Sequence, residues 1–235
     1  MKTIGLLGGM SWESSIEYYR LINEEIRKKL GGLSSARCVL FSFNFREIEE
    51  LQRLDKWKEL SNILSDAAIK LEKIGAELLL ICTNTMHKVA DDIQRSVNIP
   101  LLNIIDVTAE KILEDKIKKV GLLGTRFTME DEFFVGRLDK KFGIKAIVPS
   151  EQERQVVHDI IYQELCKGIR RESSKGKLLE IINKLTERGA EGIILGCTEL
   201  PLLVTEGDTK IKIYNTTKIH ALAAVEYALG IGDGS

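Results

Sequence analysis

The sequence predicts an α/β protein of two similar lobes, each a parallel sheet flanked by helices. Two observations support this fold class. The segment 75–85 (GAELLLICTNT) recurs as 189–199 (GAEGIILGCTE), and 2–8 (KTIGLLG) recurs as 118–124 (KKVGLLG). Apolar strands also alternate with helical segments along the chain, which is typical of parallel sheets with helices on both faces. The duplication further predicts that a pseudo-twofold axis relates the lobes.

The expected helices and strands occupy matching places in the two repeats. After the first strands we expect helices at 13–30 and 129–141, and before the repeated motif at 55–74 and 174–188. The apolar residues of 55–74 recur at helical spacing, and each helix of that pair ends at a glycine, the usual C-cap residue. The strands that follow, 78–82 and 192–196, are continuously apolar, as strands covered on both faces are.

A further strand closes each repeat, and this fixes the predicted lobe boundaries. Residues 99–106 parallel 211–215, and both precede a helical segment that contains threonine and alanine. We expect a linker near 107–117, where charged residues crowd. The last helix, 216–230, falls outside the second repeat, and we expect it to pack on the first lobe. The predicted lobes are 1–106 plus 216–235 and 107–215.

The composition is that of an ordinary globular protein. Of the 235 residues, 44% are hydrophobic and 29% are charged, and the net charge is −1. So small a net charge indicates neither a nucleic-acid partner nor an anionic membrane surface. No stretch reaches the ~18 apolar residues of a membrane helix. The four cysteines lack close-paired spacing, which is typical of reduced thiols in a cytoplasmic protein.

Short polar motifs follow four expected strands, at the ends where ligands gather in parallel sheets. They are 8–11 and 83–85 in the first lobe, and 124–128 and 197–199 in the second. At a strand-to-helix junction, small residues expose backbone N–H groups that bind a carboxylate. A thiol there is expected to have a lowered pKa and to form thiolate. Thr83 and Thr198 are equally suited to capping helices, but capping does not account for Cys197.

Cofactor and metal sites are not indicated. The first glycine-rich turn lacks the spacing of a dinucleotide fingerprint, and no phosphate loop occurs. Cys82 and His87 lack the second pair of ligands that a zinc site needs, so we expect no metal. No lysine stands in a context that marks a Schiff-base site, so no cofactor is implied.

Three side chains are candidates for binding a distal substrate carboxylate. Arg46 follows the expected strand 39–42, Gln52 offers an amide, and Lys167 is the matching candidate in the second lobe. The residues do not decide among them. A solvated charge is the alternative interpretation of Arg46 and Lys167.

At these residues the chain resembles the aspartate/glutamate racemase family, whose members act without pyridoxal phosphate. The resemblance runs from residue 4 to about 228 and rests on motifs at 8–10, 84–87, 124–125 and 196–199. The family pattern has a cysteine at both strand ends, which act as bases on opposite faces of the α-carbon. Cys197 matches the second cysteine, whereas Thr83 replaces the first. This pattern resembles the L-aspartate/glutamate-specific or broad-specificity subgroup.

The resemblance implies a cofactor-independent amino-acid racemase of aspartate and glutamate that forms a homodimer. A thiol has a pKa nearer neutrality than a hydroxyl, so we expect Cys197 to abstract the α-proton and Thr83 to donate one. Cys82 does not replace Thr83, because adjacent strand residues face opposite sides. His87 matches a family histidine. The resemblance implies substrate contacts from Met10, Gln52, Asn84, Thr85 and Lys167, and the strand-end argument adds Arg46, Thr125 and Thr198.

Two other functions stay open, and the resemblance suggests the first of them, because some relatives catalyse it. A decarboxylase of a malonate-type acid needs a single cysteine and an apolar pocket, and release of carbon dioxide would identify it. A non-catalytic amino-acid-binding protein would catalyse no α-proton exchange in deuterium oxide.

Overall fold

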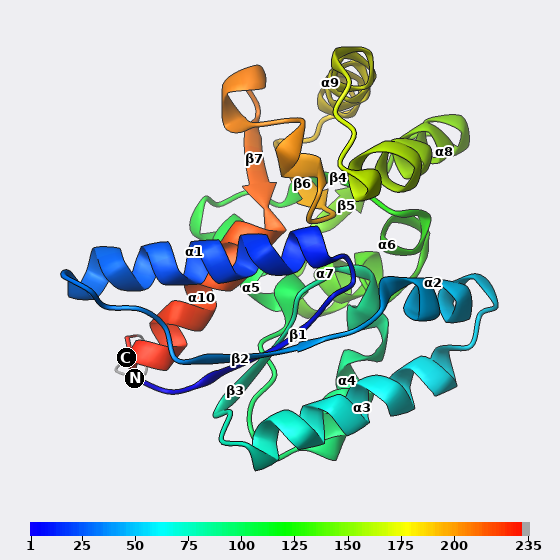
Figure 1. Ribbon diagram of the computed structural model, residues 1–235. Helices are drawn as coiled ribbons and strands as arrows, with labels where there is room; N and C mark the ends of the chain where they lie inside the picture. The colour runs from blue at the N-terminus through cyan, green and yellow to red at the C-terminus, as the bar shows by residue number, and fades with distance from the viewer. Residues whose placement is uncertain (232–235) are drawn as a thin grey trace. The chain divides into compact units, whose positions relative to one another are not determined.

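The computed structural model describes residues 1–231 and divides the chain into two compact units. The first unit comprises Met1–Ile104 and the chain from His220 onward, and the second comprises Ile105–Ile219. Positions 232–235 of the predicted first lobe lie outside the described residues. Each unit contains a parallel sheet flanked by helices (Figure 1), which confirms the predicted α/β class.

The sheet of the first unit has the strand order β2-β1-β3. Its strands are β1 (Ile4–Gly8), β2 (Cys38–Ser42) and β3 (Leu78–Ile81). All pairings are parallel, and Ile4 at the start of β1 pairs with both Cys38 and Leu78. A parallel bridge from Leu79 to Leu101 extends the sheet beyond β3, within the segment expected as a strand at 99–106.

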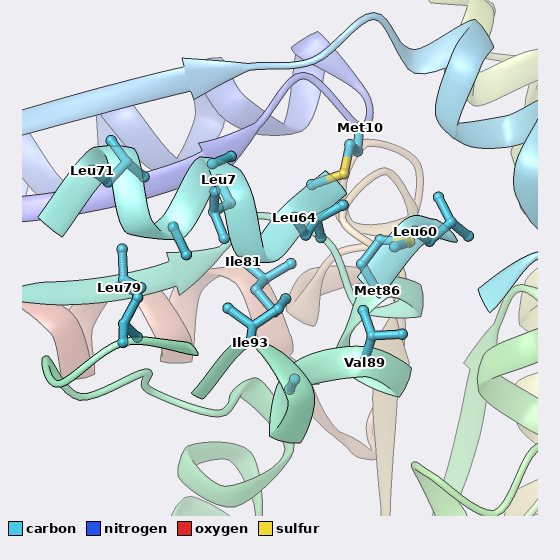
Figure 2. Close-up of a cluster of buried hydrophobic side chains, with 14 of the residues drawn as sticks. Leu7, Met10, Leu60, Leu64, Leu71, Leu79, Ile81, Met86, Val89 and Ile93 are labelled. Atoms are coloured by element: carbon cyan, nitrogen blue, oxygen red, sulfur yellow. The ribbon is translucent and has the colours of Figure 1, made fainter. Parts of the chain in front are cut away.

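Helices cover both faces of this sheet, so its central strands are apolar throughout. On one face, Ile4 and Leu80 pack with α1 (Trp12–Leu30) and with α10 (Thr216–Leu229) from Ala221 onward. On the other face, Leu7, Leu79 and Ile81 pack against α3 (Trp57–Lys73) and α4 (Ala90–Ser96), as Figure 2 shows. The remaining helical segments of this unit are α2 (Phe45–Arg53) and the 3-10 helix η1 (Thr85–Val89).

The sheet of the second unit has the strand order β5-β4-β6-β7. Its strands, all parallel, are β4 (Lys119–Gly124), β5 (Lys145–Ile147), β6 (Gly192–Gly196) and β7 (Lys212–Asn215). The helices of this unit include α6 (Arg126–Glu130), α7 (Val135–Phe142), α8 (Glu151–Asp159) and α9 (Glu172–Glu187). Short π and 3-10 turns follow α8 at Ile160–Glu164 and Leu165–Lys167, and two 3-10 turns follow β6 at Leu200–Leu202 and Glu206–Asp208.

The internal repeat is visible in how the first strand of each unit is packed. A Cβ atom on Gly5 of β1 would lie 2.8 Å from Leu79 Cδ2, and one on Gly121 of β4 would lie 2.6 Å from Ile193 Cδ1. The repeat aligns Gly5 with Gly121 and Leu79 with Ile193. The same close contact therefore recurs in both units, which explains why glycine stands at both positions.

Three expected elements differ from the structure. Of the strand expected at 99–106, only Leu101 pairs, through its bridge to Leu79, and residues 104–106 are helical. The predicted helix 129–141 is two helices, α6 and α7, separated at residues 131–134. The predicted linker near 107–117 is wrong, because most of it belongs to α5 (Ile104–Glu114). Ile105, Ala109 and Ile112 of α5 are fully buried at helical spacing. The crowded charges mark the solvated face of a helix rather than a linker.

Candidate active site

In the first unit, the carboxyl ends of β1 and β3 carry polar residues predicted to form a site. Leu7 pairs with Ile81 at the end of the two strands, so the turn 8–11 and the segment 82–85 leave the sheet side by side. Ser14 joins them, because its hydroxyl lies 2.9 Å from the Ser11 carbonyl and 3.0 Å from the Cys82 carbonyl. Gly9 has φ +80°, and a Cβ there would lie 2.3 Å from Phe43 O, so the turn requires glycine.

His87 holds the backbone of the segment that carries Thr83. Its Nδ1 lies 2.9 Å from the Thr83 carbonyl, and its Nε2 accepts the Ile104 N–H at 3.1 Å. Because Nε2 is the acceptor, Nδ1 is the donor, and the ring is neutral. Thr83 is half-buried, whereas Asn84 and Thr85 are buried. The motif histidine therefore positions the turn that presents the Thr83 side chain.

Cys82 belongs to the interior of the first unit. It is fully buried in the core with Tyr18 of α1 and the apolar residues of α10. Burial raises the pKa of the Cys82 thiol well above its ordinary value. Its neighbour Ile81 packs in the core on the other face of the sheet. Cys82 is thus a packing residue, as the alternation of strand side chains predicts.

In the second unit, Thr125 and Cys197 follow paired residues of adjacent strands. Gly124 at the end of β4 pairs with Gly196 at the end of β6, so the two side chains leave the same edge of the sheet. Thr125 is the N-cap of α6, where its side chain accepts the Thr128 N–H at 3.4 Å. Capping therefore accounts for Thr125, and a substrate contact from it stays a prediction.

Cys197, Thr198 and Glu199 form a hydrogen-bonded group. The Cys197 thiol donates to Glu199 Oε2 at 2.9 Å, and the Thr198 hydroxyl donates to the same oxygen at 2.7 Å. The single hydroxyl hydrogen of Thr198 is thus committed to Glu199, and its predicted bond to substrate needs a rotated side chain. Glu199 was not among the predicted site residues. An acidic residue two positions after a strand-end cysteine was the available signal.

The expected lowering of the Cys197 pKa is wrong in this arrangement. Burial raises the pKa of the thiol well above its ordinary value, and the charges of Glu199 and then Cys166 raise it further. The segment after β6 is a three-residue 3-10 turn, Leu200–Leu202, and not an α-helix. So short a turn supplies little of the dipole that favours a thiolate. Cys197 is therefore held as a thiol.

The segment after Thr83 also departs from the expected helix. It opens with the 3-10 helix η1 before α4 begins at Ala90. The hydrogen-bond geometry of a 3-10 helix is poorer than that of an α-helix, and such helices are short. Any anion held at 83–85 therefore depends on local N–H and side-chain donors more than on a helix dipole.

The candidates for binding a distal carboxylate differ sharply in exposure. Gln52 is buried, and its Nε2 donates to Met86 Sδ at 3.0 Å. Arg46 is 83% exposed and pairs with Glu50 at 3.1 Å. Lys167 is exposed and donates to Gln163 Oε1 at 2.8 Å. Met10 is buried in the core beside Leu64, where Figure 2 draws it.

Two kinds of feature are absent from residues 1–231. In that part of the chain, His, Cys, Asp and Glu side chains form no group of three that is able to hold a metal ion. The helices described there are also too short or too polar to cross a membrane.

Comparison with known proteins shows one consistent family. A family model described as Asp/Glu/hydantoin racemase matches residues 7–224. The broad-specificity amino-acid racemase RacX of Bacillus subtilis (strain 168) is 25% identical over 230 residues, which are 94% of this chain and 96% of RacX.

Two solved structures are similar over nearly the whole chain. A Yersinia pestis protein described as a candidate Asp/Glu racemase gives a TM-score of 0.92 at 52% identity, over 97% of this chain and 100% of its own. An aspartate racemase homologue from Pyrococcus horikoshii OT3 gives a TM-score of 0.86 at 38% identity, with the same coverage.

Proposed function

Because the chain belongs to the Asp/Glu/hydantoin racemase family, we propose that it racemises aspartate and glutamate without a cofactor. As a family member the chain is an isomerase of the amino-acid racemase type. The observation that carries the finer proposal is the pair of strand ends. Thr83 follows β3 and Cys197 follows β6, at matching positions of the internal repeat. The relatives are described as a broad-specificity amino-acid racemase and an aspartate racemase homologue, so we propose acidic amino acids as the first substrates to test.

In the proposed mechanism, Cys197 takes the α-proton and Thr83 delivers one to the opposite face of the α-carbon. The α-hydrogen is a weak acid, so hydrogen bonds must stabilise the carbanion that forms. Asn84, Thr85 and Thr198 are the proposed donors to the α-carboxylate. One donor of this kind is worth about 3 kcal/mol.

Gln52, Arg46 and Lys167 are the proposed candidates for binding the distal carboxylate of the substrate. Gln52 and Met10 are proposed substrate contacts from the first unit, since both are buried and Gln52 donates to Met86 of η1. Arg46, Lys167 and Thr125 are proposed as further contacts. Arg46 and Lys167 are exposed, so each is free to turn from its present partner toward an anion at small cost.

We further propose a homodimer in the cytoplasm. One face of α1 exposes Trp12, Ile16 and Tyr19, at 61%, 55% and 55% of their surface. These residues are spaced at helical intervals, and an apolar patch of this kind is typical of a protein interface. Sedimentation of the wild type and of Ile16→Glu tests the dimer, since the variant is expected to sediment as a monomer. The four cysteines are free thiols, which suits a reducing compartment.

Proton exchange in deuterium oxide tests the proposed activity. The protein is incubated with single L- and D-amino acids, and loss of the α-proton signal is followed by nuclear magnetic resonance. Aspartate or glutamate is expected to exchange and to racemise, and a folded Cys197→Ala variant is the control without activity. Binding of an amino acid with neither α-proton exchange nor release of carbon dioxide would identify a binding protein. Release of carbon dioxide from a substituted malonate, without exchange, would identify a decarboxylase.

A further inference from the structure

A carboxylate lies against the proposed catalytic thiol, and the mechanism above gives it no role. Glu199 Oε2 accepts the Cys197 thiol at 2.9 Å and the Thr198 hydroxyl at 2.7 Å. Cys197, Thr198 and Glu199 are 6%, 5% and 3% exposed. Water therefore competes little for this oxygen, and hydrogen bonds in such a setting are strong.

The proposed reaction needs a thiolate at Cys197, whereas the structure holds a thiol there. A negative charge on a buried carboxylate disfavours a second negative charge on the sulfur that it touches, so forming the thiolate requires a group that takes the thiol proton. Glu199 and Cys166 are the titratable groups of the second unit that act on the Cys197 thiol. Of these, Glu199 is the group that accepts a hydrogen bond from Sγ.

We propose that Glu199 is a further catalytic residue that takes the thiol proton when Cys197 acts as a base and returns it when Cys197 acts as an acid. This role rests on the proposed racemase function. Before substrate binds, the Thr198 hydroxyl supports this role, because its hydrogen bond to Oε2 holds the carboxylate against the sulfur. The contact between Oε2 and the sulfur lets the thiol lose its proton without a water molecule between the two atoms.

The proton transfers balance over one turnover. The S–H bond of Cys197 breaks and an O–H bond forms on Glu199 Oε2, while the electron pair stays on sulfur. The thiolate then takes the α-hydrogen as a proton, and the electron pair of the C–H bond passes to the carbanion. Thr83 gives its hydroxyl proton to the opposite face. Water then returns a proton to Thr83, and Glu199 releases its own proton to water.

Two variants separate proton transfer from a structural role. Glu199→Gln keeps the shape but removes the basic oxygen, and Glu199→Asp keeps a carboxylate. Glu187→Gln on the exposed surface of α9 is the matched control for loss of one negative charge. Exchange rates are measured across pH with the L- and D-substrates. Thiolate formation is measured by ultraviolet absorbance, as the difference from the Cys197→Ser form of each protein.

The Gln variant is expected to lose about 100-fold or more in exchange rate near neutral pH. Its thiolate is nevertheless expected to appear at lower pH than in the wild type, because a neighbouring negative charge is gone. Its rate should rise about tenfold per pH unit, as hydroxide replaces the missing base. Glu199→Asp is expected to recover part of the rate, and Glu187→Gln to match the wild type.

Other results would overturn the proposal. An unchanged rate and pH profile in Glu199→Gln, or a rate above that of the wild type, would leave the racemase function standing without this role for Glu199. A folded Asp variant no faster than the Gln variant would do the same. If the Gln variant does not fold, the pH profile of the Asp variant decides. If the wild type exchanges no amino acid, the proposed function and this role fail together.

Discussion

The two units share a similar arrangement of parallel strands but carry different chemical groups at equivalent strand ends. In the first unit, the strand-end residue is a half-buried hydroxyl, Thr83, whose carbonyl is held by a neutral imidazole 2.9 Å away. In the second unit it is a buried thiol, Cys197, whose proton points at a carboxylate 2.9 Å away. The repeated strands place the two groups alike within their sheets. The side chains around them decide which group is able to take a proton, so position and reactivity are set separately.

The largest expected effect comes from removing the proposed catalytic groups at the two strand ends. Cys197→Ser should lower the α-proton exchange rate about 10²- to 10⁴-fold, because it removes the general base. Thr83→Ala should cost less, about 10- to 100-fold, because a water molecule fits where the hydroxyl was and relays a proton. Both are measured by α-proton loss in deuterium oxide.

The control for these variants is Cys38→Ser, in β2 of the first unit and partly buried. Its activity should match that of the wild type. Equal losses in the Thr83 and Cys197 variants would contradict the unequal roles proposed for the two groups.

The next largest effect is expected from core substitutions that compare the packing of the two sheets. Leu79→Ala and Ile193→Ala remove equivalent, fully buried side chains, and each should lower the free energy of unfolding by about 2–5 kcal/mol. Urea denaturation followed by circular dichroism measures both variants. Circular dichroism is used because it reports on both units. Tryptophan fluorescence reports on the first unit alone, since both Trp12 and Trp57 lie there.

An exposed leucine provides the control for this comparison. Leu33 is fully exposed, and Leu33→Ala should change the free energy of unfolding by less than about 0.5 kcal/mol. A loss as small as this in either core variant would show that the aligned positions do not pack equivalently.

Acid should weaken the first unit through His220. Tyr18 Oη donates to Nδ1 at 2.8 Å, and Nε2 donates to the Leu102 carbonyl at 2.9 Å, so the ring is neutral. Burial, and then the nearby His87, lower the pKa of His220 from 6.5 to about 3. Between these values the unfolded chain binds a proton that the folded chain does not. The free energy of unfolding should therefore fall as pH drops from about 6.5 to about 3, by on the order of a few kcal/mol.

His220→Gln isolates this contribution. The variant should be less stable than the wild type near pH 7, but its free energy of unfolding should fall less between about pH 7 and about pH 4. Urea titrations followed by tryptophan fluorescence measure the difference. The same pH dependence in both proteins would show that His220 is not the titrating group.

The smallest expected effect comes from a variant that places the same chemical group at both strand ends. Thr83→Cys should raise kcat for the slower enantiomer about tenfold, because a thiol has a pKa nearer the working pH than a hydroxyl has. The ratio of kcat/KM for the two enantiomers must stay fixed, since a mutation cannot change the equilibrium constant. Thr83→Ser keeps the hydroxyl and serves as the control. No gain for the cysteine variant would count against a two-face mechanism.

Much of the fold was predictable because it depends on local patterns. Helix α1 and strand β6 fall within one residue of their expected bounds, since helical spacing and continuous apolar runs are readable along the chain. The short strand β5 and the helix α8 were missed. Strand β5 covers only Lys145–Ile147, too few residues to show a pattern. Helix α5 was taken for a linker because its charges are more conspicuous than its buried face.

The sequence by itself determined the duplicated frame, the residue types at the two strand ends and the family. Only the tertiary structure decided the protonation state of Cys197. From the sequence alone, a thiol directly after a strand is predicted to be activated, because the dipole of the expected helix favours the thiolate. In the folded protein, burial and the carboxylate of Glu199 act in the opposite direction and outweigh a three-residue turn. Desolvation and charge proximity depend on which groups surround a residue in space, and the position of that residue in the sequence does not give this information.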